Sequence, residues 1–183
     1  MIEILLNDAS FEQDIRELLM AFYPGETFTH KEEEAGEAEL IVRGVRDGNS
    51  FSLDVTPVKK EAVHFALIYP DFSNRFETKN EIKQTLYRLL SAQTGRELPW
   101  GTLTGIRPTK IALTKLYDGW TDEQIETYMR ETYFTSKEKI DLSIDVAERE
   151  RRLLSTIDYE NGYSLYVGIP FCPTTCLYCS FTS

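Results

Sequence analysis

The sequence predicts an α+β fold in which an antiparallel sheet carries its helices on one face. Two observations lead to this prediction. Short segments of strand length alternate with two amphipathic helical stripes over residues 1–95. Between two of these segments lies Asp47-Gly48, a strong hairpin signal. From residue 96 the pattern becomes helical, which predicts a helical connector over residues 96–160, and a last strand and loop follow over 161–183.

The N-terminal segment predicts a strand followed by a helix. Residues 2–6 have the length and apolar character of a strand, and Ser10 followed by Gln13 has the spacing of a capping box. Pro24-Gly25 is expected to end the helix. Its single apolar stripe consists of Phe11, Ile15, Leu18, Leu19 and Phe22.

The rest of this first unit predicts more strands and a second helix. The strands are expected at residues 26–30, 40–46, 51–55 and 62–67. Thr78 with Glu81 has capping-box spacing, and Gly95 is a natural stop for the helix that follows. The apolar stripe of that helix comprises Ile82, Leu86, Leu89 and Leu90. No cluster of titratable groups is visible in residues 1–95, so the unit alone is typical of a binding or docking module.

The connector opens with a glycine-bearing loop, Trp100-Gly-Thr-Leu-Thr-Gly-Ile-Arg-Pro-Thr-Lys110, in which Pro108 suits the first position of a helix. Backbone N–H groups at that helix start, with Arg107 and Lys110 beside them, would suit a phosphate or carboxylate. The alternative is that the apolar residues of the loop, Trp100, Leu103 and Ile106, pack a junction and the two cations are structural. Two later helix starts are expected at the capping-box pairs Thr121–Gln124 and Thr135–Glu138.

Composition argues against several classes of protein. A net charge of −10 argues against nucleic acid binding, which needs a positive face. No apolar run approaches the roughly 18 residues that indicate a membrane span. An odd number of cysteines in one motif is a poor disulfide framework, so we expect a protein of the reducing cytosol.

The cysteines are the candidate metal ligands. All three, Cys172, Cys176 and Cys179, lie in one segment with Cys-x3-Cys-x2-Cys spacing. A structural zinc site needs four protein ligands, and the histidines, His30 and His64, are not within reach. A [4Fe–4S] cluster held by three thiolates would leave one iron open for a small molecule. The alternative is buried or incidental thiols.

The surrounding residues carry a family resemblance. Tyr166-x-x-Ile-Pro-Phe-Cys-x3-Cys-x-Tyr178-Cys resembles the opening strand and cluster loop of radical S-adenosylmethionine enzymes, and within them the coproporphyrinogen III oxidase-like branch. The resemblance implies that the cysteines bind a [4Fe–4S] cluster whose open iron takes S-adenosylmethionine. It also implies that Tyr166 lies near the cluster and that Tyr178 contacts the adenine; ordinary packing is the alternative for both tyrosines.

Two further features refine the resemblance. The Trp100–Lys110 loop is similar to one in the extended N-terminal region of a Firmicute-type subgroup. Gly168 stands where many relatives have histidine, and Phe181 stands where the best-known coproporphyrinogen dehydrogenases carry a further cysteine. Because of Phe181, the resemblance does not decide whether the reaction is the decarboxylation of coproporphyrinogen.

The resemblance covers residues 163–181 most strongly, which is only the first strand and loop of a βα barrel. We therefore expect the chain to be an N-terminal fragment, inactive alone, of an oxygen-independent coproporphyrinogen III oxidase that forms protoporphyrinogen IX in heme synthesis. A heme chaperone-like relative that binds heme without decarboxylation is the first alternative. A non-catalytic docking module is the second. Coproporphyrinogen III or heme would be the partner, with no membrane or nucleic acid.

Overall fold

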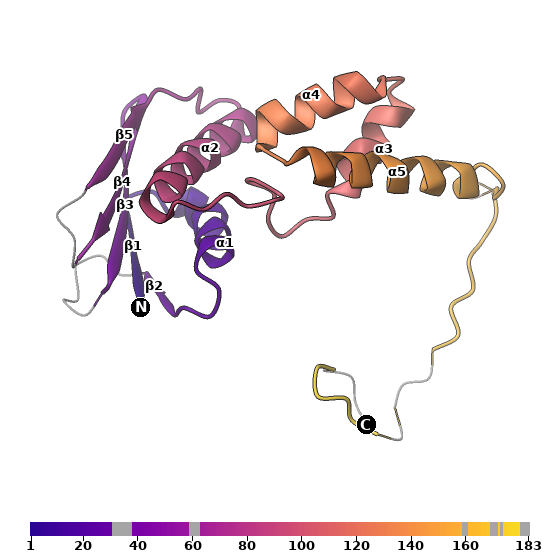
Figure 1. The fold of residues 1–183 in the computed structure, drawn as a ribbon, viewed down its shortest axis with the longest axis horizontal. Coiled ribbons are helices and arrows are strands. Elements are labelled where there is room, and N and C mark those ends of the chain that lie inside the picture. The colour runs from indigo at the N-terminus through magenta and orange to yellow at the C-terminus, as the bar shows by residue number, and fades with distance from the viewer. Residues whose placement is uncertain (31–37, 59–62, 159–160, 169–171, 173, 180–183) are drawn as a thin grey trace.

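The computed structural model describes residues 1–30, 38–58, 63–158, 161–168, 172 and 174–179. Within these ranges it forms one five-stranded sheet, five α-helices and a short 3-10 helix, η1 (Figure 1). In chain order the elements are β1 (Ile2–Leu6), η1 (Ala9–Phe11), α1 (Glu12–Phe22), β2 (Phe28–His30), β3 (Leu40–Asp47), β4 (Ser50–Pro57), β5 (His64–Ile68), α2 (Arg75–Thr94), α3 (Thr109–Tyr117), α4 (Asp122–Tyr133) and α5 (Lys137–Leu154).

The sheet has the order β2-β1-β3-β4-β5 and is mixed. β1 pairs in parallel with both β2 and β3, whereas the β3–β4 and β4–β5 pairs are antiparallel. The prediction of an antiparallel sheet is therefore wrong at β1. Helix α1 returns the chain along β1, so the strand that follows runs in the same direction, as in a crossover connection. The hairpin predicted around Asp47-Gly48 is confirmed by the β3–β4 pair.

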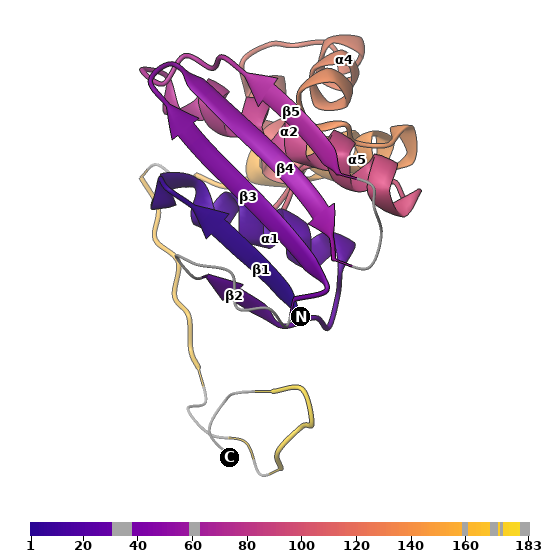
Figure 2. The same ribbon diagram turned by 90° about the vertical axis from the view of Figure 1, so that its left-hand side faces the viewer.

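Helices α1 and α2 cover one face of the sheet, as predicted (Figures 1 and 2). α1 packs against β1, and α2 packs against β4 and β5. The core between the layers contains both predicted helical stripes and alternate residues of the central strands. Its fully buried members include Ile4, Ile15, Leu18, Phe22, Phe51, Leu53, Ile82, Leu86 and Leu90.

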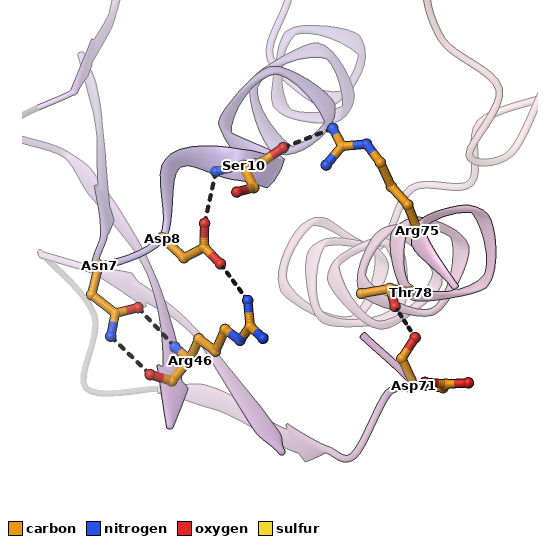
Figure 3. A network of polar contacts seen from close by, with 7 residues as sticks. All are labelled: Asn7, Asp8, Ser10, Arg46, Asp71, Arg75 and Thr78. Carbon is orange, nitrogen blue, oxygen red and sulfur yellow. Dashed lines mark hydrogen bonds and ion pairs between the residues drawn. The ribbon is translucent and has the colours of Figure 1, made fainter. Parts of the chain in front are cut away.

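The start of α1 differs from the capping box predicted at Ser10 and Gln13. The carboxylate of Asp8 accepts a hydrogen bond from the Ser10 N–H at 2.9 Å and is also paired with Arg46 at 3.1 Å (Figure 3). Gln13 instead donates to Glu17, one turn further along the helix. Asp8 therefore caps the short helix η1, and α1 follows from Phe11 without a side-chain cap, so the predicted box is absent.

The start of α2 also lies upstream of its predicted box, Thr78 with Glu81. Asn74 is the N-cap, and its side chain accepts from the Glu77 N–H at 3.3 Å. The Thr78 hydroxyl donates to the carbonyl of Asp71 at 2.7 Å and so fastens the first turn to the preceding loop (Figure 3). Gly95 ends the helix in the left-handed conformation, as predicted.

A second core lies among α3, α4 and α5. The capping box at Thr121 and Gln124 is confirmed, with both of its hydrogen bonds present. The box predicted at Thr135 is wrong by one residue, because Ser136 caps α5 and Thr135 is buried. The buried members of this core are Leu103, Ala112, Leu113, Leu116, Ile125, Met129, Tyr133, Ile140, Ile144 and Ala147. The domain boundaries expected after residues 95 and 160 stay predictions.

Beyond α5 the described residues form no strand. Residues 161–168 have no regular secondary structure, so the last strand predicted there is wrong over these positions. Their large side chains are open to solvent, with Leu165 at 80% and Val167 at 81% exposure. The described part of this segment runs away from the helices in both views (Figures 1 and 2). Since it has no neighbouring strand to satisfy its backbone groups, an extended strand is not stabilised there.

Candidate functional site

The three cysteines are free thiols at the solvent-exposed end of the described chain. Cys172 and Cys176 are exposed and Cys179 is half-buried. A turn joins the last two, since the N–H of Cys179 donates to the carbonyl of Cys176 at 3.0 Å.

The donor set fits an iron–sulfur cluster chemically. Three thiols without a fourth protein ligand suit a [4Fe–4S] cluster with one open iron better than a closed zinc site. The fold itself does not draw them together. Among the residues with described positions, no group of three histidine, cysteine, aspartate or glutamate side chains is gathered to hold a metal ion. The assignment of Cys172, Cys176 and Cys179 as ligands stays a prediction.

The two tyrosines of the motif, Tyr166 and Tyr178, are each 92% exposed, so neither is a packing residue in this structure. Their roles beside a cofactor stay predictions. Gly168 leaves room for one of them, because a Cβ added there would lie 2.8 Å from the Tyr166 ring. A side chain at 168 would require that ring to move. Phe181 lies outside the described residues.

The glycine-bearing loop is hydrogen-bonded to the chain between helices α4 and α5. The N–H of Thr102 donates to the carbonyl of Tyr133 at 2.8 Å, and the N–H of Ser136 donates to the carbonyl of Pro99 at 2.9 Å. Gly101 lies between these bonds with φ +57°, and a Cβ there would be 1.9 Å from the Tyr133 oxygen. Only glycine fits this close approach of two backbones.

Packing accounts for part of the loop, as the structural alternative predicted. Leu103 is buried in the second core and Trp100 packs against it, whereas Ile106 is 56% exposed. Arg107 is paired with Glu150 at 3.3 Å, and Lys110 is exposed. Anion binding by these two cations stays a prediction.

Sequence analysis missed a lysine beneath this loop. Lys83 on α2 is only 6% exposed, and its ammonium donates to the Thr104 hydroxyl at 2.7 Å. The Thr104 hydroxyl in turn lies 3.2 Å from a carboxylate oxygen of Glu17 on α1. The sequence gives only a weak indication that Lys83 is buried, namely its position directly after Ile82 of the apolar stripe. Its burial depends on the loop that folds over it.

Fold and motif together define a class, namely a mixed α+β protein that carries three free thiols with Cys-x3-Cys-x2-Cys spacing. No helix within the described ranges is both long and apolar enough to cross a membrane.

Comparison with known proteins gives a more particular result. The chain is 36% identical over 130 residues to the oxygen-independent coproporphyrinogen-III oxidase-like protein HemZ of Bacillus subtilis (strain 168). The match covers 69% of this chain and 26% of that relative, so the chain spans only a part of the relative's length. No protein-family profile matches the chain, and no solved structure matches it. The similarity supports the resemblance at the level of family and carries no finer assignment.

Proposed function

We propose that this chain is the N-terminal part of an oxygen-independent coproporphyrinogen III oxidase-like radical S-adenosylmethionine enzyme of heme synthesis in the cytosol. The observation that carries the proposal is the 36% identity, over 69% of the chain, to a protein named oxygen-independent coproporphyrinogen-III oxidase-like. The cysteine motif supports it independently, because its donor set suits a cluster with one open iron.

In this proposal the longer protein oxidatively decarboxylates two propionate side chains of coproporphyrinogen III to vinyl groups. Cys172, Cys176 and Cys179 would hold the [4Fe–4S] cluster, and Tyr166 and Tyr178 would line the S-adenosylmethionine site. When bound, cluster and S-adenosylmethionine together supply the one-electron chemistry that removes a hydrogen atom from the substrate.

This chain's own residues have a simpler part. The exposed thiols of Cys172 and Cys176 can reach a cluster without any rearrangement of the two cores. Both tyrosines are equally exposed, so a following barrel could enclose them and exclude water. Residues 1–183 alone are expected to be inactive, since cofactor and substrate would be held by loops of that barrel.

The experiment uses the full-length protein, purified anaerobically and supplied with coproporphyrinogen III, S-adenosylmethionine and a reductant. Loss of substrate with formation of protoporphyrinogen IX, absent in Cys172→Ala, is the expected result. Lys137→Met serves as a matched control, since the Lys137 side chain is 62% exposed and has no part in the proposed site. Stoichiometric heme binding without decarboxylation would overturn the oxidase proposal in favour of a heme-trafficking protein.

A further inference from the structure

A cavity of about 420 Å³ lies where the two cores meet, between helices α1 and α2 and the glycine-bearing loop. Its size is within the usual range for small-molecule sites. One part of its wall is apolar. Leu103, Ile111 and Tyr133 come from the second core, and the exposed side chains of Phe76 and Ile106 complete this part. The remainder is charged, and the charges are separated between the two helices.

The α2 wall supplies the positive charge. Lys83 is 6% exposed and lines the cavity, with Lys79 one turn away on the same helix. An ammonium group has three N–H donors. In the described part of the chain Lys83 uses one of them, on the Thr104 hydroxyl, and forms no ion pair. The other two donors are therefore open to an acceptor from outside the protein.

The α1 wall supplies the negative charge. Asp14 and Glu17 also line the cavity, and their charges act on Lys83, where they oppose the effect of burial, which lowers its pKa. Glu17 already accepts hydrogen bonds from Gln13 and Thr104. Asp14 accepts none from any residue whose position is described. One carboxylate is therefore available to a donor from outside the protein.

We propose that this cavity binds a free α-amino acid with an apolar side chain. Its carboxylate would accept from Lys83, its ammonium would donate to Asp14, and its side chain would lie against Leu103 and Ile111. A ligand with one sign of charge would be repelled by one of the walls. A phosphate would be repelled by Asp14 and Glu17, and a metal cation by Lys79 and Lys83. A zwitterion satisfies both at once.

The location gives the ligand a structural effect. It would touch α1 and α2 of the first core and Leu103 and Ile111, which belong to or pack against the second. Bound ligand would therefore stabilise the junction as well as each wall. This inference does not depend on the proposed cluster, so it can be tested on residues 1–183 alone.

The test measures thermal stability and calorimetric affinity of the purified chain with L-amino acids of apolar, aromatic, acidic and basic kinds. L-Leucine is the reference probe, compared with L-leucinamide, which lacks the carboxylate, and N-acetyl-L-leucine, which lacks the ammonium. We expect leucine to bind and both derivatives to bind at least about tenfold more weakly, because each leaves one charged wall without a partner.

Variants assign the contacts. Lys83→Met keeps the buried stem and removes the charge, and Asp14→Asn keeps the shape of a half-buried side chain; each should weaken leucine binding about tenfold or more. Lys137→Met, at an exposed lysine outside the cavity, should bind as the wild type does. Asp14→Asn keeps the test valid if Lys83→Met fails to fold. Absence of binding by every amino acid, equal binding of leucine and its derivatives, or unchanged affinity in Asp14→Asn would each overturn the proposal.

Discussion

A methyl group added at Gly101 would collide with the backbone at the end of α4. Gly101 has φ +57°, and the Cβ of an alanine would lie 1.9 Å from the carbonyl oxygen of Tyr133 and 2.6 Å from the carbonyl of Phe134. These are backbone atoms at the end of α4, so no side-chain rotation can relieve the contact. In Gly101→Ala the loop must move away from α4.

The magnitude has two parts. Left-handed backbone costs alanine about 1–2 kcal/mol. Moving the loop also breaks the bonds from Thr102 N–H to Tyr133 and from Ser136 N–H to Pro99. At about 1 kcal/mol each these add about 2 kcal/mol. We therefore expect Gly101→Ala to lower the free energy of unfolding by about 3–4 kcal/mol.

Gly48→Ala is the matched control. Gly48 has φ +56°, almost the same as Gly101, but a Cβ there meets nothing within 4 Å. It should therefore show the backbone strain alone, about 1–2 kcal/mol. The assay is equilibrium urea unfolding followed by circular dichroism. If the two variants lose the same free energy to within about 0.5 kcal/mol, the close approach of loop and helix is not as described.

Three more predictions use the same unfolding assay. Phe134, at φ 57° with its ring 5.5 Å from Tyr87, should tolerate glycine better than alanine by about 1 kcal/mol, because glycine alone relieves the strain; equal losses would contradict this. Asp8→Ala should cost about 1 kcal/mol at neutral pH. Hydrogen bonds from Ser10, then the interaction with Arg46, hold the pKa of Asp8 below its usual 3.8. The difference in free energy of unfolding between wild type and Asp8→Ala should therefore shrink as pH falls through that lowered pKa. A difference that stays constant with pH would refute the cap. Burial lowers the pKa of Lys83 in the folded state below its ordinary 10.5. Between the folded and unfolded pKa the unfolded state binds more protons, so wild-type stability should rise with pH there, and Lys83→Met should lack that rise. If the stabilities of the two proteins change with pH in parallel, a buried charge is excluded.

Local patterns predicted the helices well. The Thr121–Gln124 box and the apolar stripes depend on residues within one or two turns of each other, and the structure confirms them. The boxes at Ser10 and Thr78 failed because a better acceptor lies just upstream in each case, Asp8 or Asn74. Sequence spacing alone does not decide between two adjacent caps.

The sheet was harder because strand partners are non-local. The length and apolar character of β1 predict a strand but not its neighbours, and its parallel pairing with β2 follows from the path of the chain through α1. The last predicted strand failed for a related reason, since residues 161–168 have no partner in the described structure.

The candidate sites divide in the same way. The cysteine motif was visible because its members lie within eight residues of each other. Lys83 was not, because its burial and its bond to Thr104 join residues 21 positions apart. In the Trp100–Lys110 loop the sequence predicts an anion site at Arg107 and Lys110. The lysines that line the cavity beside this loop are Lys79 and Lys83.

The central claim concerns the three cysteines, and iron content tests it most directly. The full-length protein and its Cys172→Ala variant are reconstituted anaerobically with iron and sulfide, and the bound iron of each is measured together with the electron paramagnetic resonance spectrum. Wild type should hold about four irons per chain and change its reduced spectrum when S-adenosylmethionine is added, and the variant should lose the cluster. Equal iron content in the two proteins would contradict the account.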